Sequence, residues 1–130
     1  MNRFTKNVLM IGAIAIMTAI ILGAFGAHAL QDKLSEESLE VFKTGVQYQF
    51  MHGFAILICG LLSLQLAEAR MRNPVILFVL GTIFFSGSLY LLSTREITNL
   101  DWPFLGPITP LGGLFFIVGW LLFVMQIVKK

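Results

Sequence analysis

The side chains that could carry chemistry in this sequence are two histidines, two tyrosines and a few hydroxyl and amide residues inside apolar segments. The candidates are His28, Tyr48, Gln49, His52, Ser86, Ser88, Tyr90 and Thr109. An imidazole can move a proton or ligate a metal or haem, and hydroxyls and amides can hydrogen-bond a ligand. The chain has no glycine-rich phosphate loop, nucleophile elbow or paired intramembrane carboxylates. We therefore assign no catalytic residue and no metal site, expect no cofactor, and favour a protein that is not an enzyme.

Four apolar runs must position these residues. Each has roughly the 20 residues that ~30 Å of hydrocarbon requires of a helix. The runs are Val8–Ala27, Val46–Leu66, Val75–Leu92 and Ile108–Val128, and none contains Asp, Glu, Lys or Arg. With 57% hydrophobic and 12% charged residues among 130, the chain is too apolar for a soluble domain. We predict one all-α membrane domain, residues 1–130, built as a four-transmembrane-helix bundle.

The first run resembles a signal peptide at first sight. Arg3 and Lys6 precede it, and Ala27-His28-Ala29 matches the small-x-small pattern of signal peptidase sites. A signal peptide, however, has an apolar region of about 7–15 residues, and this run is longer. We expect it to be retained as the first transmembrane helix.

The distribution of Lys and Arg predicts the orientation, because cytoplasmic loops carry the excess of these residues. With the N-terminus inside, six basic residues are cytoplasmic, namely Arg3, Lys6, Arg70, Arg72, Lys129 and Lys130. The outside receives Lys33, Lys43 and Arg95. Both termini are therefore predicted to be cytoplasmic, and this direction brings all eight candidate polar residues toward the outer membrane face. The sequence has no cluster of basic residues of the kind that binds nucleic acid, so we expect no nucleic-acid partner.

The connection between the first two runs is predicted to contain a short amphipathic helix at about residues 36–44. Ser35 is a suitable N-cap, and Glu36 and Glu37 suit the positive end of the helix dipole. At ~100° per residue, the acidic side chains and Lys43 share one face and apolar side chains the other. This segment should lie at the outer interface and lead into the second span.

Small residues mark the faces that should pack together, because they let helix backbones approach in lipid. The packing candidates are Gly12, Ala19, Gly23, Gly60 and Gly112. Gln49 and His52 share the small-residue face of the second run, so they should point into the bundle rather than at lipid. Cys59, the single cysteine, is interpreted as a packing residue. Faces of this kind also permit a homo-oligomer or a larger membrane complex.

Several short motifs together resemble a known family. They are Gly23-Ala24-Phe25-Gly26-Ala27-His28, Gly45-Val46-Gln47-Tyr48-Gln49 with His52, Phe85-Ser86-Gly87-Ser88-Leu89-Tyr90, and Thr109-Pro110-Leu111-Gly112-Gly113. In this order they resemble the YgdD/YwdK family of small, uncharacterised, four-span bacterial inner-membrane proteins. The resemblance implies four spans in the bacterial plasma membrane, and it implies no activity.

Three functional hypotheses remain open. The leading one is a binding or interaction protein. Its outer-leaflet polar cluster either holds a lipid headgroup or small ligand, or steadies the bundle. Its apolar exterior contacts the bilayer, a partner protein or a second copy. The alternative is a small oligomeric transporter or channel using His52, although no span has the acidic residue that proton coupling usually requires. The third is haem or metal binding through His28 and His52; two imidazoles suffice for haem, whereas catalytic zinc normally needs three protein ligands.

Overall fold

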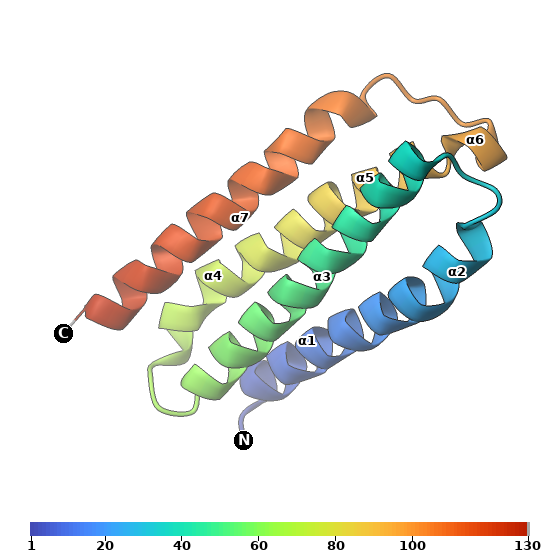
Figure 1. The fold of residues 1–130 in the computed structure, drawn as a ribbon. Coiled ribbons are helices and arrows are strands. Elements are labelled where there is room, and N and C mark those ends of the chain that lie inside the picture. Colours follow the sequence, from blue (N-terminus) through green and yellow to red (C-terminus); the bar gives the residue numbers. More distant parts are fainter. Residues whose placement is uncertain (130) are drawn as a thin grey trace.

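The computed structural model describes residues 1–129, and all of its regular structure is helical. Lys130, one of the basic residues in the orientation argument, lies outside the described residues. Four long helical stretches are apolar enough to cross a membrane, and their bounds are Arg3–Leu30, Glu36–Leu62, Glu68–Ser93 and Leu105–Val128. They run alternately up and down, so that the described ends of the chain lie at the same end of the molecule (Figure 1).

The first and third stretches are each interrupted by a π-helical segment. The first comprises α1 (Arg3–Ile21), η1 (Leu22–Gly26) and α2 (Ala27–Leu30). The third comprises α4 (Glu68–Gly81), η2 (Thr82–Ser86) and α5 (Gly87–Ser93). A π-turn adds a residue, so it rotates the face that the following residues present. Both segments overlap the glycine-containing motifs of the sequence, at Leu22–Gly26 and Thr82–Ser86.

The second and fourth stretches are single helices, α3 (Glu36–Leu62) and α7 (Leu105–Val128). The predicted short helix at 36–44 is therefore not a separate element, because α3 continues through it without a break. Its amphipathic pattern is real, but the apolar face continues into the span and no turn residue intervenes. The short helix α6 (Arg95–Thr98) follows α5 and ends at Asn99, whose φ of 55° is left-handed.

The helices extend beyond the apolar runs that predicted them. α3 begins ten residues before Val46, and α4 begins seven before Val75. An apolar run marks the part of a helix suited to hydrocarbon, whereas capping and dipole interactions let polar residues continue the helix into water. Ser35 caps α3 by accepting a hydrogen bond from the Ser38 N–H, and Glu36 and Glu37 lie in its first turn.

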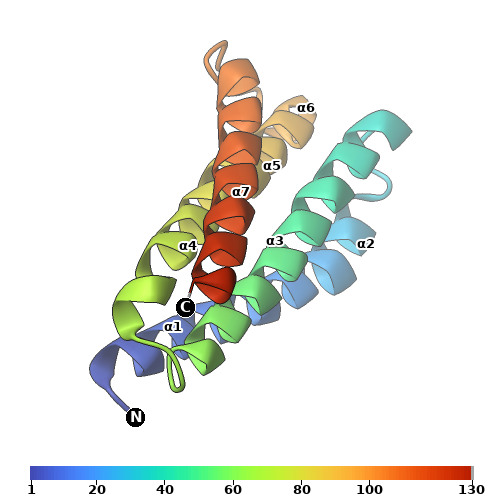
Figure 2. The ribbon, with the colours of Figure 1, turned by 90° about the vertical axis from the view of Figure 1, so that its left-hand side faces the viewer.

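The four stretches pack in the spatial order α1, α3, α4–α5, α7. α1 lies along α3, α3 also packs on α4, η2 and α5, and α7 packs on α4 and η2. Along their described lengths, α3 and α7 make no backbone contact, and their axes diverge toward one end (Figure 2). We call that end, which carries Asp32, Glu36, Glu37, Glu40, Glu96 and Asp101, the acidic end, and the opposite one the terminal end.

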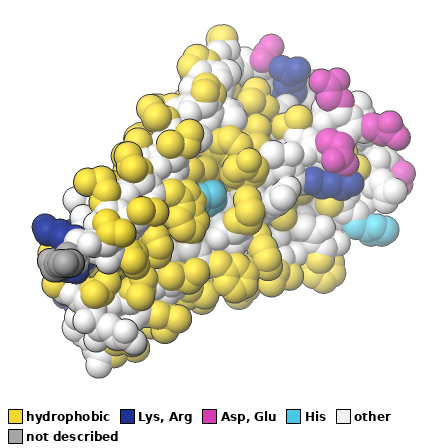
Figure 3. Space-filling model, turned by 60° about the vertical axis from the view of Figure 1, so that its left-hand side comes forward, with side chains coloured by type: hydrophobic (Ala, Val, Ile, Leu, Met, Phe, Trp, Pro, Cys, Tyr) yellow, Lys and Arg dark blue, Asp and Glu magenta, His cyan; other side chains and the backbone are white. Residues whose placement is uncertain are grey.

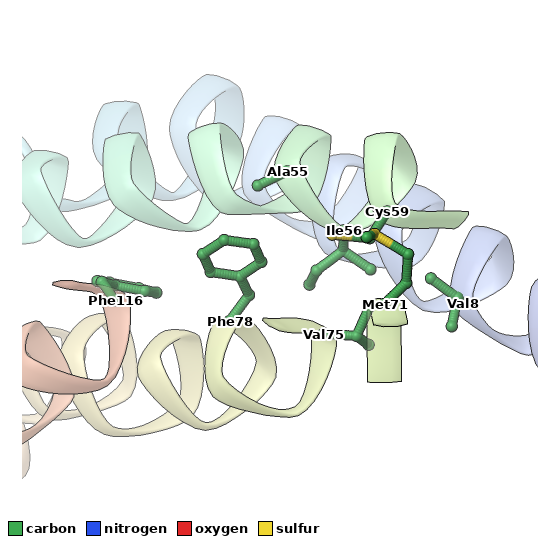
Figure 4. Close-up of a cluster of buried hydrophobic side chains, with 8 residues drawn as sticks. All are labelled: Val8, Ala55, Ile56, Cys59, Met71, Val75, Phe78 and Phe116. Atoms are coloured by element: carbon green, nitrogen blue, oxygen red, sulfur yellow. The ribbon is translucent and has the colours of Figure 1, made fainter. Parts of the chain in front are cut away.

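A hydrophobic core joins the helices in the half of the molecule near the terminal end. Phe78 of α4 and Ile56 of α3 are almost fully buried at its centre, and Met71, Cys59 and Val8 surround them (Figure 4). Phe116 of α7 extends the cluster toward the acidic end. Thr5 and Ser63 close its terminal side with a 2.7 Å hydroxyl–hydroxyl hydrogen bond. This core fixes α3 and α4 against each other and leaves α7 to be held from one side.

Candidate functional site

Gln49 is the centre of the polar interactions that hold α1, α3 and α5 together. Its side-chain nitrogen donates to the Ala15 carbonyl at 3.0 Å and to the Thr18 hydroxyl at 2.8 Å. Its side-chain oxygen accepts a hydrogen bond of 2.7 Å from the Tyr90 hydroxyl. The amide thus uses both of its functional ends in one connected chain that crosses three helices.

Two serines make the corresponding links on the other sides of α5 and η2. Ser86 is fully buried and donates to the Gly45 carbonyl of α3 at 2.7 Å. Ser88 shares a 2.7 Å hydroxyl–hydroxyl hydrogen bond with Thr109 of α7. We refer to Thr18, Gln49, Ser86, Ser88, Tyr90 and Thr109 as the polar layer. Each member of the polar layer bonds another part of the protein, so the layer joins all four stretches.

His52 lies on the α7 side of α3, apart from the polar layer. Its Nδ1 is 2.8 Å from the Tyr48 carbonyl, and its Nε2 is 3.2 Å from the indole nitrogen of Trp120. An indole N–H only donates, so Nε2 must accept and Nδ1 must carry the proton. The imidazole is therefore neutral in this arrangement. Its ring stacks on Phe116, with centroids 3.5 Å apart and planes 9° from parallel.

A recess opens beside His52 between α3 and α7, and we call it the aromatic recess. It measures about 370 Å³ and is lined by Tyr48, Met51, His52, Phe85, Gly113, Phe116, Ile117 and Trp120. Figure 3 shows a histidine at the bottom of a hollow between hydrophobic ridges in the middle of the molecule. Because Ile117 is 67% exposed and Trp120 41% exposed at its rim, the recess opens on the lateral surface of the helices. The hydroxyl of Tyr48 forms no hydrogen bond within residues 1–129 and is the unused polar group of this lining.

A second hollow lies at the acidic end, between α3, α5, α6 and the start of α7, and we call it the acidic-end pocket. It measures about 430 Å³. On one side Glu96 accepts hydrogen bonds from the Ser38 hydroxyl at 2.5 Å, the Ser35 hydroxyl at 3.0 Å and the Ser35 N–H at 3.2 Å. These bonds, that of Ser38 foremost, hold the pKa of the Glu96 carboxyl below its ordinary value. Val41, Leu89 and Leu92 form the apolar wall.

The structure brings together most, though not all, of the residues singled out from the sequence. Gln49 meets Tyr90, Ser88 meets Thr109, and Tyr48 stacks on His52 with ring centroids 6.2 Å apart. His28 is exposed on α2, and within residues 1–129 its side chain forms no hydrogen bond with this group. The two histidines therefore lie in different surroundings, since His28 is exposed on α2 and His52 is buried beneath α7. Among the described residues, no three His, Cys, Asp or Glu side chains are grouped to hold a metal ion.

Sequence reasoning did not identify Thr18, Phe116 or Trp120 as part of this arrangement. Thr18 lies beside the small-residue face of α1, next to Ala15 and Ala19. That position could have indicated that its hydroxyl faces another helix. The position of Trp120 was a weaker indication, because a tryptophan in the middle of a span, away from the interface, needs a hydrogen-bond partner for its N–H. The packing glycines contact their neighbours closely: an added Cβ at Gly60 would lie 2.8 Å from Leu9, and one at Gly23 would lie 3.1 Å from Val46.

Comparison with known proteins shows which family this sequence resembles. Residues 22–113 match a family model described as a protein of unknown function, DUF423. The chain is 40% identical over 124 residues to the UPF0382 membrane protein SH2409 of Staphylococcus haemolyticus, covering 95% of this chain and 97% of the relative. It is 39% identical over 125 residues to the UPF0382 membrane protein YwdK of Bacillus subtilis, covering 95% and 98%. No solved structure is significantly similar.

The chain is thus a membrane protein with several transmembrane helices. In particular, it belongs to the DUF423/UPF0382 family, which includes YwdK, and the resemblance found in the motifs is confirmed. The names of these relatives state a membrane location and no activity. Any function must therefore be inferred from the arrangement of the residues.

Proposed function

We propose that this protein is a binding protein of the bacterial plasma membrane that takes the hydrophobic part of an amphiphile from the bilayer into the aromatic recess. The observation that carries the proposal is the lateral opening of a 370 Å³ hollow lined by aromatic rings. Sites for small ligands are mostly apolar and have few polar groups to orient what they bind. The free Tyr48 hydroxyl in the lining of the recess supplies such a group.

The polar layer supports the proposal by needing no ligand. Within residues 1–129, no buried side-chain nitrogen or oxygen lacks a hydrogen-bond partner. Buried polar groups are costly unless they are paired, and these groups are already paired with one another. Of the two roles that the sequence left open for these residues, binding a ligand or steadying the bundle, we therefore favour the second, in which the polar layer fixes the helices around the aromatic recess.

The state of His52 favours binding over proton transport. Both ring nitrogens are hydrogen-bonded, one to the Tyr48 carbonyl and one to Trp120, and the ring is covered by Phe116. A proton carrier needs a free nitrogen on each side of the path in turn. Here the imidazole instead fixes the position of Trp120 at the rim of the aromatic recess.

Filling the aromatic recess tests this proposal. A Cβ at Gly113 would lie 3.7 Å from the Phe85 ring, an ordinary contact, so Gly113→Leu should fold and project into the hollow. Gly87→Leu is the matched control, because Gly87 has open space and faces a different groove. Native mass spectrometry of protein extracted with its lipids should show retained lipid in the wild type and in Gly87→Leu, and little in Gly113→Leu. Equal retention in all three would contradict the proposal.

We also propose that both termini are cytoplasmic and that the acidic end faces outward. The support is the excess of Lys and Arg around the terminal end, at Arg3, Lys6, Arg70, Arg72 and Lys129. Asp101→Cys and Gln65→Cys place thiols in exposed connections at the two ends. A membrane-impermeant maleimide should label Asp101→Cys in intact cells and Gln65→Cys only after permeabilisation. The reverse pattern would invert the assignment.

A further inference from the structure

The aromatic recess and the acidic-end pocket are two separate hollows that lie in line along the same helices, and we call the line that they define the groove. On α7, Thr109 lines the pocket and Gly113 lines the recess, and residues four apart lie on one helix face. Beneath them on the third stretch, Leu89 and Phe85 have the same spacing. On α3, Val41 and Tyr48 are two turns apart on one face. From Thr109 to Trp120 the groove spans eleven residues of α7, which is about 16 Å at 1.5 Å per residue.

The polarity of this groove changes along its length. The end beside His52 has an aromatic and aliphatic lining and opens toward hydrocarbon. The other end carries hydroxyls and charges and opens at the level where the helices leave the membrane-spanning segment. A phospholipid has the same order of chemistry, with a charged headgroup, then ester groups, then acyl chain. The groove therefore matches a lipid lying parallel to the helices.

The charges of the acidic-end pocket distinguish between headgroups. The oxygens of Glu96 accept hydrogen bonds from Ser35 and Ser38. Arg95 lies close enough to contribute to the lowered pKa of Glu96, but it forms no hydrogen bond or ion pair with it. Within residues 1–129, neither the Arg95 side chain nor that of Glu37, which also lines the pocket, forms a hydrogen bond or ion pair. The pocket thus offers one available guanidinium and one available carboxylate. A guanidinium suits a phosphate, and a carboxylate suits a primary ammonium.

Resting on the proposed function, we propose that the ligand is an aminophospholipid with an ethanolamine-type headgroup. Its phosphate contacts Arg95, its ammonium contacts Glu37, and one acyl chain follows the groove into the aromatic recess. An anionic headgroup without an amine leaves Glu37 unpaired and brings a net negative charge beside Glu37 and Glu96. A choline headgroup carries no N–H to donate to Glu37. The pair of opposite charges therefore selects the zwitterion that has a primary amine.

Lipid retention by the full-length protein tests the headgroup. Protein delipidated in detergent is offered phosphatidylethanolamine, phosphatidylcholine or phosphatidylglycerol of identical acyl chains, and the bound fraction is measured by native mass spectrometry. Retention of phosphatidylethanolamine should exceed that of the other two. Arg95→Gln and Glu37→Gln should each lower its affinity about tenfold, the size of one lost charge-assisted hydrogen bond. Lys33→Gln and Glu36→Gln, at the same end but outside the pocket, should leave it unchanged.

The outcomes separate this inference from the proposed function. If Gly113→Leu abolishes retention of all three lipids while the headgroup variants change nothing, the aromatic recess binds lipid but the headgroup assignment is wrong. If Gly113→Leu changes nothing, the proposed function itself fails. Met51→Trp, which fills the recess from the α3 side, gives the same test if Gly113→Leu does not fold. A dimer mass that Gly113→Leu abolishes, in place of bound lipid, would make a second copy the occupant and would overturn both.

Discussion

The interface between α1 and α3 and the gap between α3 and α7 differ in how closely the backbones approach. At the first, a Cβ on Gly12 would lie 3.0 Å from the Gly53 carbonyl oxygen, so two glycines bring the helices into backbone contact. At the second, the contacts are made only by side chains, chiefly His52 on Phe116 and Trp120. Glycine-lined helix pairs close completely, whereas a pair spaced by aromatic rings leaves room that a lipid can fill.

α7 packs closely on α4 and η2 but not on α3, and this one-sided packing leaves the gap between α3 and α7. It lies against η2 at Gly112, where an added Cβ would overlap the Phe85 backbone, and against α4 at Gly119, where it would lie 2.9 Å from Phe78. Toward α3 it presents Gly113, Phe116, Ile117 and Trp120. Tight packing on one face therefore determines where the opposite face stands open.

The largest expected effect comes from breaking that tight packing. Gly112→Ala places a methyl group against the Phe85 backbone, which cannot move aside as a flexible side chain can, so it should cost at least about 1–3 kcal/mol. Gly113→Ala, the adjacent residue on the open side, meets only ring atoms at 3.7 Å and beyond and should be neutral or slightly stabilising. Thermal unfolding followed by circular dichroism in one detergent compares them. Equal unfolding midpoints for the two variants would contradict the view that one face of α7 is tightly packed and the other is open.

The next effect concerns the polar link across the closed side. Gln49→Leu removes three interhelical hydrogen bonds, two to α1 and one to α5, and at an average of roughly 0.6 kcal/mol for each such bond in a membrane it should cost about 2 kcal/mol. Gln47→Leu, exposed on the same helix, is the control and should leave the free energy of unfolding unchanged. Tyr90→Phe combined with Gln49→Leu should be less than additive, because both remove the same bond. Additivity in this cycle would show that the bond contributes nothing.

A smaller effect is expected on the open side. Trp120→Phe keeps an aromatic ring at the rim but removes the hydrogen bond to His52, which should cost about 0.6 kcal/mol. Trp102→Phe, in the exposed connection before α7, is the matched control. The free energy of unfolding in mixed micelles measures both. A loss as large as that of Gln49→Leu would mean that the two sides of α3 are held equally firmly.

The smallest effect concerns the exposed Glu96 that joins α6 to the start of α3. Its pKa is lowered because the ionised form accepts hydrogen bonds from Ser38 and Ser35. The stabilisation is therefore complete above the ordinary carboxyl pKa and is lost as the pH falls through the lowered pKa. Hydrogen exchange of the first turns of α3 should be faster in Glu96→Gln than in wild type at neutral pH, and the difference should disappear in acid. Asp101→Asn, which removes an exposed carboxylate outside α3, should show no such difference, and a difference that persists in acid would contradict the ionic origin.

The apolar runs were sufficient to predict four spans and the all-helical class, because the requirement to satisfy backbone groups in hydrocarbon allows few alternatives. They placed the helix ends less well. α3 begins at Glu36 and absorbs the segment expected to be a separate short helix, since its charged first turns are stabilised by a cap and by Glu96 rather than by hydrophobicity. Hydropathy does not register interactions of that kind.

The sequence predicted that the candidate polar residues lie toward one end, but it did not determine their partners. Gln49 points to α1 and α5 while His52, three residues later, points to α7. The π-turn at Thr82–Ser86 contributes to this arrangement, because it changes which residues of the third stretch face α3 and which face α7. A projection that assumes a regular α-helix throughout that stretch therefore cannot assign the faces correctly on both sides of the π-turn.

The sequence by itself determined that this chain is a membrane protein of the DUF423/UPF0382 family with four helices long and apolar enough to span a bilayer, because long uncharged runs and motif order are local properties of the chain. Only the tertiary structure decided that the polar residues bond one another and that the space for a ligand lies between α3 and α7. Those features depend on helix order and on the distance between axes. The side chains that meet across helices fix both, with glycines where helices touch and aromatic rings where they stand apart.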